Sequence, residues 1–150
     1  MKVLFLDIDG VLNGHDYDKG AESNLIRREC VDRLNTVLEL TGASLVISSA
    51  WRYMILNGAM TLSGFTYLLR THGVRCPGRV IGFTGRDTQV EDPAERGRLI
   101  KAWLAERPEV TRWAVVDDMA LGFDGMPFVR TKGGVGLATE DALALVELLR

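Results

Sequence analysis

Acidic and hydroxyl side chains directly follow three short apolar runs of the sequence. The runs are residues 3–6, 44–47 and 113–116, and the polar residues after them are Asp7 and Asp9, Ser48 and Ser49, and Asp117 and Asp118. If the runs are neighbouring parallel strands, these side chains meet at the edge of the sheet where ligands bind. Four carboxylates gathered there repel one another unless a cation lies among them, and their hard oxygens suit Mg²⁺. The sequence therefore predicts a magnesium site at this edge.

Each of these groups, taken alone, also has a purely structural explanation. Carboxylates after a strand often cap the next turn or helix. The hydroxyls of Ser48 and Ser49 can likewise bond the backbone of a loop. Repulsion among the gathered carboxylates disfavours a structural role for all of them together.

The elements that must position these side chains alternate along the chain between short apolar runs and longer amphipathic patterns. Strands are predicted over residues 3–6, 44–47, 80–83, 113–116 and 128–129, and helices over 26–41, 60–72 and 139–149. A further helix starts at Asp92-Pro93-Ala94-Glu95, where Asp92 caps the helix and Pro93 takes its first position, and Pro108 lies beyond its end. This order predicts an α/β fold with a mainly parallel five-stranded sheet and helices on both faces.

Composition limits the class of protein further. The chain has 150 residues, 47% of them hydrophobic and 25% charged, which indicates a single globular domain over 1–150. A net charge of −2 excludes a broad electrostatic grip on nucleic acid or anionic lipid, although a local basic patch stays open. The two cysteines form no CxxC motif, so a reducing cytoplasm is expected. The apolar run at the N-terminus breaks at Asp7, which is too short for a membrane segment.

The motif Leu6-Asp7-Ile8-Asp9-Gly10-Val11 resembles the first motif of the haloacid dehalogenase (HAD) superfamily of phosphatases. Ile47-Ser48 and Val116-Asp117-Asp118 are similar to its second and fourth motifs. The patterns Ser-Ser-x-Trp-Arg, Gly-Arg-x-Ile-x-x-Trp-Leu and Gly-Leu-x-Thr resemble the small HAD domains of RNA repair (Swiss Army Knife) systems. The resemblance implies a three-layer Rossmann-like core. The short segments after the first motif and after Ser49 leave no room for a cap domain.

This resemblance implies a role for each candidate residue. Asp7 is the nucleophile and Asp9 the general acid and base. Mg²⁺ is bound by Asp7, by the backbone carbonyl of Asp9 and directly by Asp118, while Asp117 binds through water or holds the basic residue of the third motif. The expected phosphate ligands are Ser48 or Ser49, Arg52, and Arg96 or Arg98, with Lys101 deeper in the same helix. His15 is a further candidate for substrate contact.

The function expected from this resemblance is a Mg²⁺-dependent phosphatase that hydrolyses a phosphomonoester through an aspartyl phosphate. An open site suits a large or accessible substrate, such as a nucleic-acid end or a nucleotide, and Trp51 either stacks on a base or simply packs. The alternatives are a non-catalytic phosphate-binding module and a small-metabolite phosphatase capped by oligomerisation. Haloacid dehalogenation is disfavoured because Asp9 supplies the acid typical of the phosphatases. No membrane partner is expected, and the oligomeric state stays open.

Overall fold

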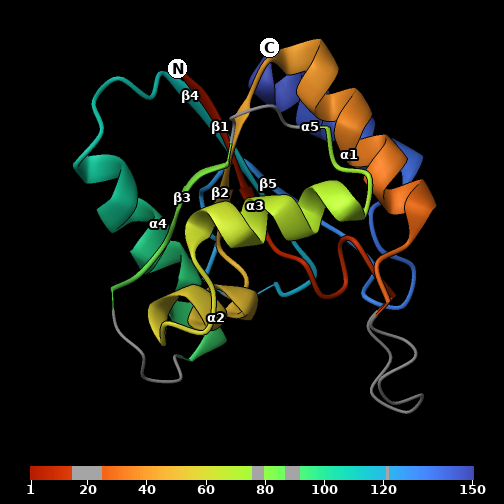
Figure 1. Ribbon diagram of the computed structural model, residues 1–150. Helices are drawn as coiled ribbons and strands as arrows, with labels where there is room; N and C mark the ends of the chain where they lie inside the picture. The colour runs from red at the N-terminus through yellow and green to blue at the C-terminus, as the bar shows by residue number, and fades with distance from the viewer. Residues whose placement is uncertain (15–24, 76–79, 87–91, 121) are drawn as a thin grey trace.

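A computed structural model describes residues 1–14, 25–75, 80–86, 92–120 and 122–150, and it contains a parallel sheet (Figure 1). The strands are β1 (Lys2–Leu6), β2 (Ser44–Ile47), β3 (Val80–Phe83), β4 (Arg112–Asp117) and β5 (Phe128–Arg130). Their order across the sheet is β3-β2-β1-β4-β5, and every neighbouring pair is parallel. The predicted fold class is confirmed, and each predicted strand lies within two residues of the observed one.

The helices also follow the predicted pattern closely. They are α1 (Arg28–Thr41), α2 (Tyr53–Leu56), α3 (Leu62–Thr71), α4 (Arg96–Ala105) and α5 (Thr139–Leu149). Two short 3₁₀ helices, η2 (Ala50–Arg52) and η3 (Pro93–Glu95), precede α2 and α4. The Asp92 carboxylate caps η3 by accepting a hydrogen bond from the Ala94 N–H at 3.0 Å. The predicted helix start is therefore a 3₁₀ turn, and the pair η2 and α2 was not predicted.

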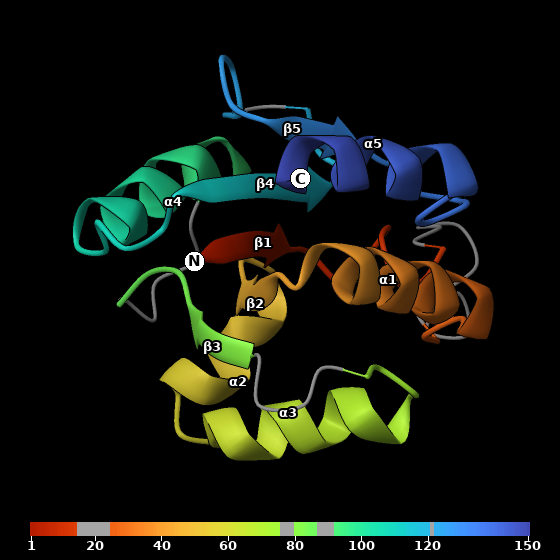
Figure 2. The same cartoon turned by 90° about the horizontal axis from the view of Figure 1, so that it is seen from above.

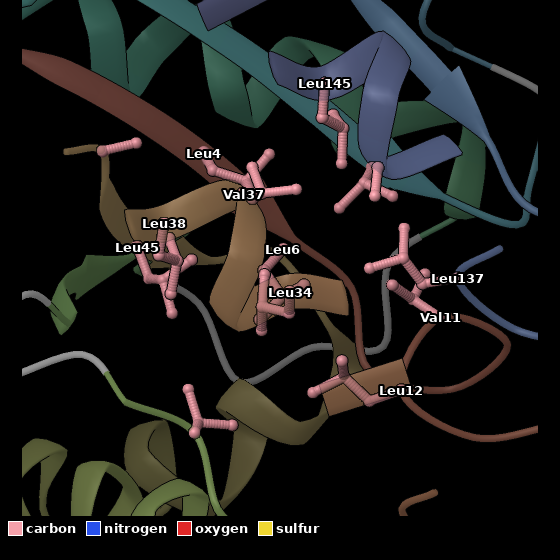
Figure 3. Close-up of a cluster of buried hydrophobic side chains, with 14 of the residues drawn as sticks. Leu4, Leu6, Val11, Leu12, Leu34, Val37, Leu38, Leu45, Leu137 and Leu145 are labelled. Atoms are coloured by element: carbon pink, nitrogen blue, oxygen red, sulfur yellow. The ribbon is translucent and has the colours of Figure 1, made fainter. Parts of the chain in front are cut away.

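The helices form a layer on each side of the sheet, as the view from above shows (Figure 2). Side chains alternate along β1, so that Leu4 and Leu6 face one layer and Phe5 faces the other. The larger core holds buried residues of α1, α3 and α5, among them Leu34 and Leu145 (Figure 3). The smaller core packs α4 against the opposite face. This three-layer packing holds the sheet in place from both sides.

The strand register explains why the site lies where it does. Leu6 pairs with Ile47 on one side and with Val116 on the other, so three strands end at the same level. The Asp7 N–H continues the ladder to the Val116 carbonyl at 3.1 Å, and the Ser48 N–H bonds the Leu6 carbonyl at 3.0 Å. The polar residues that follow β1, β2 and β4 are therefore brought to one edge.

The segment between β2 and β3 contains no cap domain in its described part. Its longest helix, α3, buries Phe65 and Leu69 in the core beneath the sheet. The helices between β1 and β2 and between β3 and β4 also pack on the sheet. Among the described residues, no helix has the length and apolar character needed to cross a membrane.

Candidate active site

Two buried carboxylates share one guanidinium at the carboxyl end of the sheet. Nη1 of Arg96 lies 2.7 Å from Oδ2 of Asp117 and 3.3 Å from Oδ2 of Asp7. The side chains of Asp7 and Asp117 are 4% and 0% exposed, and that of Arg96 is 12% exposed. Arg96 begins α4, so this ion pair joins the end of the central strands to the helix on one face. The guanidinium partly offsets the negative charge that the fold has withdrawn from water at this edge.

The pKa values of Asp7, Arg96 and Asp118 are all raised by their surroundings. Burial first and the negative charge of Asp117 second raise the pKa of Asp7, Arg96 opposes them, and together these effects bring it to about 8. Burial alone would lower the pKa of Arg96, but Asp7 and Asp117 raise it above its ordinary value. The pKa of Asp118 is also raised, first by burial and then by Asp117. The site therefore has an excess of negative charge that a cation would relieve.

A third carboxylate completes a donor set for such a cation. Oxygen atoms of Asp7, Asp117 and Asp118 lie within 4.8 Å of one another. Asp117 already uses both of its oxygens, because Oδ1 accepts from the Met119 N–H at 2.8 Å and Oδ2 binds Arg96. Asp118, which is only partly buried, is the better placed of the pair to contribute an oxygen. Buried carboxylate oxygens at this separation fit Mg²⁺, so the residues present match the expected ion.

Gly10 admits the Asp118 carboxylate to this cluster. Its φ is +79°, and a Cβ added to it would overlap the Asp118 side chain. The loop turns immediately, since the Leu12 N–H bonds the Ile8 carbonyl at 2.8 Å. The expectation that the chain leaves strand geometry at this glycine is confirmed.

Asp9 lies outside the group of three clustered carboxylates and is held by two side-chain donors. Nδ2 of Asn13 donates to its Oδ1 at 2.9 Å, and Nε1 of Trp51 donates to its Oδ2 at 2.9 Å. The side-chain Oδ1 of Asn13 accepts a hydrogen bond from the Gly10 N–H at 2.8 Å, which ties this contact to the turn itself. The carboxylate of Asp9 is thus held apart from the cluster of Asp7, Asp117 and Asp118.

The two serines after β2 have different surroundings. Ser48 is fully buried, and among the described residues its Oγ has no hydrogen-bond partner. A buried hydroxyl without a partner is costly, so a ligand that bonds it would be stabilised there. Oγ of Ser49 instead accepts from the Trp51 N–H at 3.2 Å and caps η2. Ser48 is therefore the serine available to a phosphoryl oxygen.

The predicted basic residues separate into three environments. Arg96 lies beside the carboxyl groups of Asp7 and Asp117. Arg98 is exposed and pairs with Glu95 at 3.0 Å, and Lys101 is also exposed. Arg52 is buried, with Nη1 donating to the Ser49 carbonyl at 2.9 Å and the Ser48 carbonyl at 3.3 Å.

These positions bear differently on the predicted roles. Arg98 was an alternative to Arg96 for the third motif, and the structure places only Arg96 beside Asp7 and Asp117. Arg52 braces the loop that carries Ser48, and its direct contact with a phosphate stays a prediction. His15, expected near the substrate, lies outside the described residues.

Sequence reasoning missed the two residues that hold Asp9. Trp51 is predicted either to stack on a base or to pack, and its ring does pack edge-on against Phe65, with 6.4 Å between the ring centroids. Its indole N–H, however, donates a hydrogen bond to the Asp9 carboxylate. The only signal in the sequence was the Ser-Ser-x-Trp-Arg pattern, which places the tryptophan just after the second motif. Asn13 carried no signal beyond its place in the loop after the first motif.

The fold and this site define a class of protein. An all-parallel sheet in the order β3-β2-β1-β4-β5, with carboxylates following β1 and β4 and a serine following β2, is the core expected of the HAD superfamily. Residues 3–142 match the family described as the HAD domain in Swiss Army Knife RNA repair proteins. The chain belongs to this family, which confirms the resemblance. No curated protein matches the chain.

Proposed function

We propose that this protein is a Mg²⁺-dependent phosphatase that cleaves a phosphomonoester through a phosphoryl group carried on Asp7. The observation that carries the proposal is the convergence of Asp7, Asp117 and Asp118 within 4.8 Å at the end of the sheet. Two further observations support it: the Ser48 hydroxyl has no hydrogen-bond partner in the described part of the chain, and the chain belongs to the HAD superfamily. Asp7 and Asp9 are both present, which favours a catalyst over a module that only binds phosphate.

Each residue has a role that follows from its chemistry. Asp7 attacks phosphorus as a carboxylate, forming an O–P bond while the bond to the leaving oxygen breaks. Asp9 gives its proton to that oxygen, and as a carboxylate it then takes a proton from the water that releases phosphate from Asp7. Ser48 donates to a phosphoryl oxygen, and Arg96 holds the Asp7 side chain in place. Mg²⁺, when bound by Asp7 and Asp118, supplies positive charge that lets one anion approach another.

The substrate we propose is a phosphate on an accessible group, with a nucleic-acid end or a nucleotide as the first choice. The description of the family, which names RNA repair, supports a nucleic-acid substrate. The described residues form no cap over the sheet edge, which suits a large substrate. We also propose a cytoplasmic location, because the chain shows no cysteine pattern typical of disulfide-bonded proteins. Cys30 is buried and its thiol is free.

The test is the release of phosphate from p-nitrophenyl phosphate with Mg²⁺ and with a chelator. The proposal predicts that the chelator abolishes activity, that Mg²⁺ restores it, and that Asp7→Asn lowers kcat by about a thousandfold or more. The exposed Asp124→Asn is the matched control and should behave like the parent protein. Full activity in chelator, or activity of Asp7→Asn within about tenfold of the parent, contradicts the proposal.

A second comparison addresses the substrate. We expect a higher kcat/KM for an oligonucleotide with a terminal phosphate than for the mononucleotide or a sugar phosphate, because groups beside the phosphate add binding energy. A higher kcat/KM for the sugar phosphate would refute the nucleic-acid substrate and leave the phosphatase chemistry intact.

A further inference from the structure

The side chain of Asp9 accepts hydrogen bonds from two segments of the chain. Asn13 reaches Oδ1 from the loop after β1, and Trp51 reaches Oδ2 from η2 after β2, each at 2.9 Å. Residues 9 and 51 are 42 positions apart in the sequence, so the second bond exists only in the folded sheet. With one donor on each oxygen, the carboxyl plane has a fixed orientation.

The tryptophan that makes this bond is itself held firmly. Its ring packs edge-on against Phe65 of α3, which is fully buried. The Trp51 backbone N–H is bonded by Oγ of Ser49, which caps the 3₁₀ helix that carries the tryptophan. The indole N–H is therefore a rigid donor, unlike a long flexible side chain. Such support from packing is what a precisely oriented catalytic group needs.

We propose that Trp51 is a positioning residue for Asp9, and that its indole N–H aims the Asp9 carboxyl at the leaving oxygen of the substrate. This inference rests on the proposed function. The indole N–H only donates, so it occupies one lone pair of Oδ2 in either protonation state of Asp9 and transfers no proton itself. The proton that Asp9 delivers must then leave from another position on the carboxyl group. Trp51 in this role is not a stacking platform for a base.

The variant that isolates the bond is Trp51→Phe, which keeps an aromatic ring against Phe65 and removes the N–H. The matched control is Trp113→Phe, at the start of β4 and at the opposite end of that strand from Asp117. The substrates are glycerol 2-phosphate, whose alkoxide leaves poorly without a proton, and p-nitrophenyl phosphate, whose phenolate needs none. General acid assistance should matter only for the first.

For Trp51→Phe we expect kcat/KM on glycerol 2-phosphate to fall by about tenfold to a hundredfold, as for the loss of a hydrogen bond to a charged group. On p-nitrophenyl phosphate it should change by less than about threefold, and Trp113→Phe should change neither. Equal losses on both substrates would show a binding or folding defect and overturn the inference. A parent protein that hydrolyses neither substrate would instead count against the proposed function.

A second measurement needs no turnover. The chain has three tryptophans, and the indole N–H signal that disappears in Trp51→Phe identifies Trp51 in a ¹H–¹⁵N correlation spectrum. In Asp9→Ala this signal should shift, because it loses its acceptor, while the signals of the other two tryptophans stay in place. An unmoved Trp51 signal would overturn the inference even if no substrate has been found.

Discussion

Replacing Asp7 by asparagine should stabilise the metal-free protein while it removes activity. Burial, and after it the negative charge of Asp117, raise the pKa of Asp7 from 3.8 to about 8 against the opposing effect of Arg96. At pH 7 the unfolded chain ionises this carboxyl freely, whereas the folded protein keeps it largely protonated, which costs the folded state on the order of 4 kcal/mol. Burying the asparagine amide offsets about 1–3 kcal/mol of that gain. We expect a net increase in the free energy of unfolding of about 1–3 kcal/mol.

The pH dependence gives the sharper test. Between pH 3.8 and about 8 the folded protein binds more protons at Asp7 than the unfolded chain does, so the stability from this group falls as pH rises. Asp7→Asn has no carboxyl group at this position, so its free energy of unfolding lacks this dependence on pH. In urea denaturation with a chelator, the difference between variant and parent should widen by about 3 kcal/mol from pH 5 to pH 7. Exposed Asp124→Asn is the control. Parallel pH profiles of the parent and Asp7→Asn would refute the electrostatic reasoning.

Three other changes probe the same site. Gly10→Ala should cost about 1–3 kcal/mol of stability, because φ at this position is +79°. It should also weaken Mg²⁺ binding, because the new Cβ displaces the Asp118 side chain. Unchanged affinity in a metal titration would contradict this. Arg96→Gln removes the guanidinium that binds the buried side chains of Asp117 and Asp7, and should cost about 3–5 kcal/mol in the metal-free protein. The exposed Arg98→Gln should cost less than about 0.5 kcal/mol, and both are measured by denaturation. Asp118→Asn should weaken Mg²⁺ binding, measured calorimetrically, more than Asp117→Asn, and the reverse order would exchange their roles.

The sequence predicted the sheet well because its apolar runs are short, nearly continuous and bounded by polar residues. Buried parallel strands require that pattern, and it places Asp7, Ser48 and Asp117 at strand ends without further information. The convergence of these ends also follows, since parallel strands in register finish at one edge. The helices between Ala50 and Leu56 were not predicted because they have only three and four residues, and an amphipathic pattern is recognised over a window of about 11–18 residues.

Which side chains contact one another in the site depends on three-dimensional geometry that the pattern of neighbouring residues in the sequence does not contain. Arg96 and Arg98 are two residues apart in a helix, so they point to nearly opposite sides. Choosing between them requires the phase of the helix, which a 3₁₀ first turn alters. Arg52 is predicted to bind phosphate because it follows the second motif closely and arginine can bind phosphate through two parallel hydrogen bonds. That its guanidinium is buried against backbone carbonyls does not follow from the sequence. The bond from Trp51 to Asp9 joins distant segments, and only the folded sheet brings them together.

The most direct test of the central claim is to trap the phosphoryl group on Asp7 during turnover. Rapid quenching with borohydride reduces an acyl phosphate on aspartate to homoserine, which peptide mass spectrometry can locate. The account predicts homoserine at position 7 in the parent protein, only with Mg²⁺ and substrate, and at no position in Asp7→Asn. Steady phosphate release without any modification at position 7, or with the modification at another aspartate, would contradict it.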